Sequence, residues 1–250
     1  MRAGARFQKV LVVLVAGLWL LTVPDAEVRA GQNSAVTNWN GLYLGAHAGG
    51  GWAFNEVTRT DASSAPNFPL GFVDTPSRPN GFLGGGYAGY NYQAGRYVVG
   101  LEADYSWANL SGDSSDVGFV GNTAYRTDKV VWIATAGARL GYTFDRWMMF
   151  GKGGWGWAGF KRDSFSVVPG GALLGIANYS DTRNGWLLGA GVEWEFTPQW
   201  SLRLAFDYIQ FSDVNLTINV TQVATGIMST STVRASSSLS TLKIGIGRRF

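Results

Sequence analysis

The sequence predicts an all-β fold: an eight-stranded antiparallel up-and-down transmembrane β-barrel, preceded by a cleavable signal peptide. Three observations predict it. Eight segments alternate between two kinds of side chain with a period of two, which is the period of a β-strand. Charged residues keep to one face of these segments. The connections between the segments alternate between short and long.

The first thirty residues are typical of an export signal. Arg2, Arg6 and Lys9 precede an uncharged apolar run of 14 residues from Val10 to Val23. At ~1.5 Å per residue a helix of this length spans about 21 Å, short of the ~30 Å hydrocarbon core of a membrane. We therefore predict a signal peptide over 1–30 rather than a membrane-spanning helix, and a barrel domain over 31–250.

The composition favours a strand-built membrane protein. The chain has 35 Gly, 11 Trp, 10 Tyr and 14 Phe, but only 15% charged residues, against ~25% in an average soluble domain. The leader holds four basic and two acidic residues, so the net charge of +3 falls to +1 for residues 31–250. This near-neutral balance gives no reason to expect a nucleic-acid partner. The absence of cysteine excludes disulfides and thiolate metal sites.

The first alternating segment shows the pattern. Its even positions include Leu42, Leu44, Trp52 and Phe54, whereas its odd positions are small or polar, His47 among them. Seven further segments alternate in the same way, and in the fourth the apolar face begins at Val130 and includes Trp132. The eight predicted strands cover residues 41–54, 81–93, 97–108, 130–143, 148–159, 185–196, 201–211 and 239–250.

Charges test this interpretation. Five acids and five bases share the non-aromatic face, whereas only Arg248 falls on the aromatic face. A face that excludes charge by ten to one contacts lipid or a hydrophobic core; in a membrane barrel it contacts lipid, and the other face lines the lumen. An eight-stranded barrel is just wide enough inside for side chains, and buried charges require partners. We therefore predict a neutralised lumen network of Glu102, Asp104, Arg139, Lys152, Glu193, Glu195, Arg203, Asp207, Lys243 and Arg249.

The connections predict the topology. Short ones are expected at 94–96, 144–147 and 197–200, and long ones at 55–80, 109–129, 160–184 and 212–238. Short turns on one side and long loops on the other are typical of outer-membrane barrels. Since an export signal delivers the N-terminus to the periplasm, we expect the short turns there and the long loops outside. Because open strand edges are too costly in lipid, the eighth strand must pair with the first.

The candidate catalytic motifs are weak. Residues 84–89 match G-x-G-x-x-G, but no helix follows, so a strand glycine run is the better interpretation. His47 is the only histidine; no second histidine or cysteine completes a metal site, and no sequence feature places a serine beside it. The paired acids Glu102/Asp104 and Glu193/Glu195 face five bases, which favours ion pairing over acid–base catalysis. We expect no enzyme activity, cofactor or metal.

The segment Trp39-Asn40-Gly41-Leu42-Tyr43-Leu44-Gly45 resembles the opening strand of small alphaproteobacterial outer-membrane barrels. This is the RopB-type porin family, related to OmpA-like and opacity-protein barrels. The resemblance continues through 89–93, 139–142, 185–193 and the terminal Phe250. It implies an outer-membrane location, roles in envelope integrity or surface contact, and recognition of Phe250 by the barrel assembly machinery. Two positions depart from the family pattern: Arg248 replaces a frequent aromatic residue, and Ala205 replaces a frequent acid.

Two functions remain open at this stage. The first is a structural and surface-interaction barrel, held in outer-membrane lipid, whose long loops meet extracellular ligands. The second is a small porin that passes ions or very small solutes. The balanced lumen charges favour a plug, whereas lumen glycines such as Gly45 and Gly89 leave space for water. A soluble binding barrel is excluded, because its outer face would then carry the charges and its interior more Trp and Tyr than so small a barrel holds.

Overall fold

The computed structural model describes residues 37–60, 71, 73–117, 121, 123–222 and 228–250. The predicted signal peptide, 1–30, lies outside them. No helix long and apolar enough to cross a membrane occurs in the described part of the chain. Nine strands are formed there: β1 (Gly41–Arg59), β2 (Asn80–Ala94), β3 (Tyr97–Val117), β4 (Thr123–Phe144), β5 (Trp147–Val167), β6 (Leu173–Thr197), β7 (Trp200–Phe211), β8 (Val214–Gln222) and β9 (Met228–Arg249).

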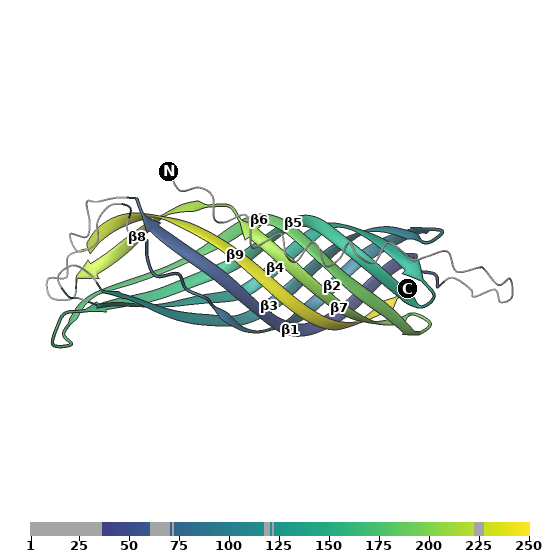
Figure 1. The fold of residues 1–250 in the computed structure, drawn as a ribbon, viewed down its shortest axis with the longest axis horizontal. Helices are drawn as coiled ribbons and strands as arrows, with labels where there is room; N and C mark the ends of the chain where they lie inside the picture. Colours follow the sequence, from purple (N-terminus) through teal and green to yellow (C-terminus); the bar gives the residue numbers. More distant parts are fainter. Residues whose placement is uncertain (1–36, 61–70, 72, 118–120, 122, 223–227) are drawn as a thin grey trace, which may run out of the picture. The chain divides into compact units, whose positions relative to one another are not determined.

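The strands form a closed antiparallel sheet in which sequence neighbours pair from β1 to β7 (Figure 1). β7 pairs with β9, and β9 pairs with β1 from Tyr43↔Arg249 to Arg59↔Val233. The predicted up-and-down fold and its closure by the first and last strands are therefore confirmed. Closure leaves no unpaired edge, which hydrocarbon would not tolerate.

The prediction of eight strands was wrong by one, for a local reason. β8 pairs with β9, as β7 does, and its last residues pair with β6. It therefore continues the line of β7 after a break at Ser212 and Asp213, neither of which belongs to a strand. The closed sheet therefore has eight strand positions around the ring, and β7 and β8 together occupy one of them.

Strands extend well beyond the predicted bounds, always at the end where long loops were expected. β3 to β6 contain 21 to 25 residues each. Most of 109–129, 160–184 and 212–238 is therefore strand rather than loop, whereas of the described residues in 55–80 only 55–59 and residue 80 belong to strands. Both faces of these extensions are rich in Ser, Thr, Asp and Asn, because the inside holds polar side chains and the outside meets water. The contrast between faces that reveals a strand in lipid is absent there.

The three predicted short turns are confirmed as two-residue hairpins. Ala94 pairs with Tyr97 and Phe144 with Trp147, and the first central residue of each turn has a positive φ, 62° at Gly95 and 52° at Asp145. That sign suits the twist of antiparallel strands. In the third turn, Pro198 precedes Gln199, whose φ is 80°, the arrangement of a type II turn. We call this the short-turn end, and the opposite one the long-loop end.

One predicted side-chain orientation is wrong. Val130 was assigned to the lipid face with Trp132, yet it is fully buried inside the barrel. The pairing of β4 with β5 shifts by one residue between Val130 and Trp132. This β-bulge inserts one extra residue and reverses the alternation on its far side.

Candidate functional site

The inward face carries a cluster of charges nearer the short-turn end. Eight of the ten predicted lumen residues are buried there, each less than 8% exposed. They are four acids and four bases, so their formal charges cancel. We define this lumen cluster as Glu102, Asp104, Glu193, Asp207, Arg139, Lys152, Arg203 and Lys243.

Glu102 of β3 is the most heavily bonded acid of the lumen cluster. Arg203 donates to both of its carboxylate oxygens, at 2.6 and 2.7 Å. Arg139 donates to Oε2 at 3.1 Å, and Lys152 Nζ lies 3.3 Å from Oε1. Tyr43 of β1 adds its hydroxyl at 2.9 Å. Through these contacts Glu102 links β3 to β1, β4, β5 and β7.

The remaining members extend the lumen cluster across the ring. Arg139 donates to Glu193 at 2.9 Å. Lys152 Nζ lies 3.0 Å from Asp207, and Lys243 Nζ lies 2.8 Å from Asp207 and 3.0 Å from Asp104. Each lysine therefore bridges two acids. Together these ion pairs connect β3, β4, β5, β6, β7 and β9.

The last two predicted lumen residues lie apart from the others. Arg249 donates to Glu195 at the short-turn end, where both side chains are partly exposed. The Arg249 guanidinium also lies over the ring of Trp39, 4.9 Å from its centroid. This pair closes the rim rather than joining the lumen cluster.

His47 has neighbours that sequence reasoning missed. Its Nε2 lies 2.9 Å from Ser106 Oγ, and its Nδ1 lies 3.4 Å from an oxygen of Asp104. Sequence reasoning found no feature that places a serine beside His47, yet the fold brings Ser106 there. Ser106 is two strands away in the ring, and the inward parity of β3 was the available signal. Both side chains are buried, and the adjoining cavity, lined in part by His47 and Asp104, is only about 10 Å³, the space of one water.

Lumen glycines are filled by tyrosine rings rather than by empty space. A Cβ built at Gly45 would overlap the ring of Tyr87, and one built at Gly89 would overlap the hydroxyl of Tyr43. The guanidinium of Arg203 lies 4.5 Å from the Tyr87 ring centroid. The expectation that these two glycines leave room for water was therefore wrong, because the phenol ends of the two tyrosines occupy that space.

An apolar layer crosses the lumen on the long-loop side of the lumen cluster. Among the described residues, every strand except β8 contributes to it, and all its members are at least 95% buried. Within it Phe160 and Phe211 meet edge to face, with ring centroids 5.3 Å apart. We define the apolar layer as Ala53, Leu83, Leu110, Val130, Ile133, Ala158, Phe160, Leu187, Ile209, Phe211 and Leu239.

A second charged group lies beyond the apolar layer. Arg162 binds Asp128 through Nε and Nη2, at 2.5 and 2.7 Å, and lies 3.4 Å from Asp74. Arg126 contacts Asp74 at 3.2 Å and also binds Asp116. Burial raises the pKa of Asp74, against the opposing charges of Arg126 and Arg162. We call these five residues the outer cluster; none of them was among the predicted lumen residues.

The outward face carries two bands of aromatic side chains with an aliphatic belt between them. On β3, Tyr97 lies in one band and Trp107 in the other, with Val99, Leu101 and Ala103 between. Ten residues rise roughly 33 Å along a strand, or about 25 Å at a tilt of ~40°, which is the height of the apolar band of outer-membrane barrels.

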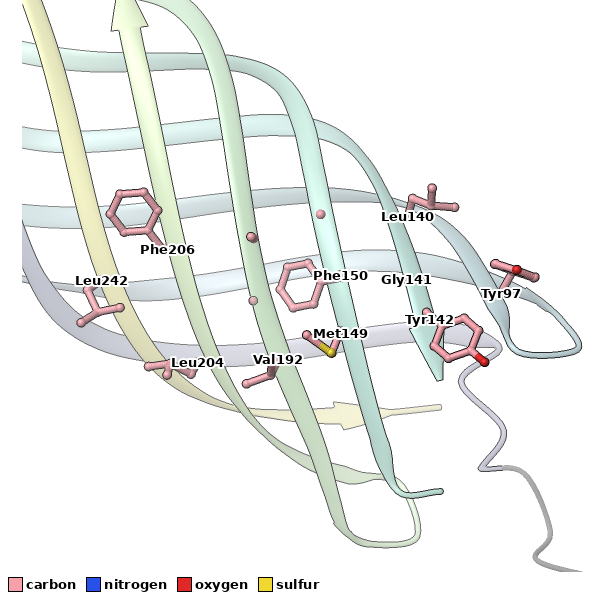
Figure 2. Close-up of a pocket in the computed structure, with 13 residues that line it drawn as sticks. Tyr97, Leu140, Gly141, Tyr142, Met149, Phe150, Val192, Leu204, Phe206 and Leu242 are labelled. Carbon is pink, nitrogen blue, oxygen red and sulfur yellow. The ribbon is translucent and has the colours of Figure 1, made fainter. Parts of the chain in front are cut away.

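The belt has a hollow that contains no charged residue. Figure 2 shows this surface groove of about 540 Å³, lined by side chains such as Leu140, Met149, Leu204 and Leu242. Gly151 and Ala190 are paired across β5 and β6 within it. Apart from Tyr97 and Tyr142, only glycine and apolar side chains line it, so the hollow suits a hydrocarbon chain rather than a polar ligand.

Comparison with known proteins agrees with this geometry. The family described as "Outer membrane protein beta-barrel domain" matches residues 20–250. This chain belongs to that family. It is 31% identical to the 31 kDa outer-membrane immunogenic protein of Brucella melitensis over 220 residues, 84% of this chain and 89% of the relative. It is 25% identical to the 22 kDa outer membrane protein of Rhizobium leguminosarum, over 85% of this chain and 79% of that protein.

Membership of the outer-membrane β-barrel family confirms the resemblance inferred from the sequence and places the chain in outer-membrane lipid. The outer membrane protease OmpT of Escherichia coli has a similar fold, with a TM-score of 0.55 at 9% identity, covering 84% of this chain and 97% of OmpT. At that identity the likeness concerns the fold alone.

The last residue of this outer-membrane β-barrel, Phe250, lies on the lipid face. Phe250 is 60% exposed, and its N–H donates to the carbonyl of Leu42 at 2.9 Å, which seals the last strand to the first. Gly41 has a φ of 110°, and a Cβ there would collide with the carbonyl oxygen of Phe250. Arg248 lies between the rings of Trp200 and Phe250, 5.8 and 5.1 Å from their centroids.

Proposed function

We propose that this protein is a non-conducting outer-membrane barrel with a structural and surface-contact role. The proposal rests on three groups of side chains that fill the barrel interior one after another along its axis: the lumen cluster, the apolar layer and the outer cluster. An ion crossing the barrel would have to pass the buried ion pairs and then the apolar layer, to which all eight strand positions of the ring contribute. Each of those steps costs an ion its hydration.

Planar bilayer recording tests the sealed lumen. Purified, heat-modifiable barrel should give no discrete current steps in concentrated KCl. A variant with both Phe160 and Phe211 changed to Ala should also stay silent, since the lumen cluster still closes the barrel. Reproducible steps from the wild-type protein would instead establish the small porin that the sequence left open.

The same interior speaks against hydrolysis. The contacts of His47 with Ser106 and Asp104 have the atom types of a catalytic triad, but Asp104 is also bound by Lys243. Ser106 is 1% exposed, so a substrate carbonyl cannot reach its Oγ. Ser106→Ala should therefore leave whole cells and purified barrel unchanged in ester and peptide hydrolysis. Activity that disappears with this variant would establish an enzyme.

The outer face of the strand extensions beyond the aromatic band, at the long-loop end, supports a role in surface contact. There the outward side chains of Val117, Tyr125, Phe165 and Ile176 are each more than 40% exposed, and the rings of Tyr125 and Phe165 stack at 5.1 Å. Polar residues separate this apolar tip from the lipid belt. Exposed apolar patches on a surface in water are typical of contact sites. The relatives named as immunogenic proteins also agree with presentation at the cell surface.

Cell-surface adhesion tests the contact role. Cells that carry Tyr125→Ser with Phe165→Ser should partition less into a hydrocarbon phase than cells with the wild-type barrel. The matched control is Asn178→Ser, on the same outer face but already polar. Equal partition of all three strains, at equal amounts of folded barrel, would remove the apolar tip from the proposal.

A further inference from the structure

Two lysines face each other on the outside of the wall, just beyond the aromatic band. Lys129 of β4 and Lys161 of β5 are direct cross-strand partners. Like charges placed directly opposite each other destabilise an antiparallel pair. Asp163 lies 3.7 Å from Lys129 in an exposed pair. Asp113, on the same outer face of β3, accepts a hydrogen bond from Thr127. Within the described residues Lys161 forms no ion pair, so its charge has no direct partner.

Hydroxyl groups extend the same row on both sides. Ser111 of β3 pairs with Lys129, and Ser180 of β6 pairs with Lys161. The row therefore runs Ser–Lys–Lys–Ser across four adjacent strands on one exposed face, and all four side chains can donate hydrogen bonds. We call it the lysine row. An oxyanion with several acceptor oxygens fits such a row of donors.

The distance of the lysine row from the aromatic band indicates which kind of ligand it meets. Trp107, Trp132 and Trp157 of the aromatic band lie three or four residues away along β3, β4 and β5, roughly 10–13 Å along a strand. Aromatic bands mark the level where hydrocarbon meets headgroups. The lysine row therefore stands where the phosphates of outer-leaflet lipids lie, and outside the barrel, so no pore is needed to reach it.

We propose that the lysine row binds the phosphate ester of an anionic lipid in the outer leaflet, with one phosphate shared by Lys129 and Lys161 and flanked by Ser111 and Ser180. The aromatic band below would hold the acyl chains of the same lipid. Binding relieves the repulsion between the two lysines. It also fixes the depth and rotation of the barrel relative to neighbouring lipids. This inference does not depend on whether the lumen conducts.

Native mass spectrometry of the full barrel tests the site. The barrel is released from uncharged detergent micelles that contain either phosphatidic acid or diacylglycerol with the same chains. We expect the wild type to retain one phosphatidic acid. Each lysine near a membrane surface strengthens the attraction of an anion about fivefold, so Lys161→Gln should lower retention about fivefold and the double change with Lys129→Gln about 25-fold.

Two further variants fix the interpretation. Arg234→Gln removes an exposed charge that is paired with Asp213 at the long-loop end, and it should bind as the wild type does. Asp163→Asn removes the competing acid and should increase retention. The heat-modifiable band in detergent alone should be unchanged or more stable in Lys161→Gln, because only a like-charge contact is lost.

Three results would overturn the proposal. Equal retention by the wild type and the double lysine variant would show that the row is not the site. Equal retention of diacylglycerol would show that the acyl chains alone are held. Displacement of the lipid by millimolar inorganic phosphate would show a site for free anions instead of lipids.

Discussion

Single side chains in the lumen act through shared partners rather than isolated pairs. Glu102 accepts from three bases and a tyrosine, and each of the two lysines bridges two acids. Strand parity was enough to predict that these charges face inward. Their partners were not predictable, because contacts across the ring depend on how far each strand is staggered. The same limit hid Ser106 beside His47.

Arg139→Ala should destabilise the barrel strongly, since it leaves Glu193 without its closest base. Breaking a buried pair costs about 3–5 kcal/mol. Adding Glu193→Gln should recover part of the loss, because the uncompensated acid is then gone. Unfolding by urea, followed through the heat-modifiable band, measures the double-mutant cycle.

Lys129→Ala is the control for this cycle. Its partner Asp163 is exposed, and an exposed pair contributes under about 1 kcal/mol. If Arg139→Ala is as mild as Lys129→Ala, then the lumen is hydrated and the sealed-barrel proposal gives way.

Asp116 should make the outer cluster sensitive to acid. Burial alone would raise its pKa, but hydrogen bonds from Thr75 and the charge of Arg126 outweigh burial and hold the pKa below its usual range. A lowered pKa in the fold gives stability that is present above the unfolded value, ~3.9, and lost as the pH falls through the folded value. The difference in unfolding temperature between the wild type and Asp116→Asn should therefore be larger at pH 7 than at pH 3. Asp213→Asn, with an exposed carboxylate, should differ little from the wild type at either pH; a constant gap for Asp116→Asn would contradict the assignment.

At the scale of strands, the sequence predicted best where the two sides of the barrel differ most. Between the aromatic bands one side meets lipid and the other the lumen, so the period of two was clear. Above the bands both sides are polar, so the pattern predicts a loop up to residue 184, whereas β6 already begins at Leu173. The bulge at Val130 also escaped detection, because one inserted residue changes the parity without changing the composition.

The last strand should depend on its terminal aromatic residue for assembly. Phe250 continues the pairing with β1 and presents its ring to lipid beside Arg248. Deleting Phe250, or changing it to Ser, should lower the amount of heat-modifiable barrel in the outer membrane while the total made stays constant. Phe250→Trp, which keeps an aromatic ring, is the control. Full assembly of the deletion variant would show that recognition of the chain does not use this ring.

For the whole molecule, closure in lipid explains why the topology was predictable from so little. A strand edge cannot be left open in hydrocarbon. Eight alternating segments joined by short hairpins at one end must therefore close into a ring, with the first strand paired to the last. The interior was less predictable. Parity places Leu187 and Leu239 on the inward face, but whether such residues meet in one layer depends on how far each strand is staggered.

The orientation of the whole barrel in the membrane is testable because the chain has no cysteine. Ala172 lies in the connection between β5 and β6 at the long-loop end, and Arg146 lies in a short turn; both are exposed. If an exported chain inserts from the periplasm, the short turns stay there. A membrane-impermeant maleimide added to intact cells should therefore label Ala172→Cys and not Arg146→Cys, whereas both should be labelled after the outer membrane is permeabilised. Neither substitution touches the lumen cluster or the apolar layer, so both variants should fold as the wild type does. Labelling of Arg146→Cys alone in intact cells would invert the barrel, and it would place the apolar tip and the lysine row on the periplasmic side.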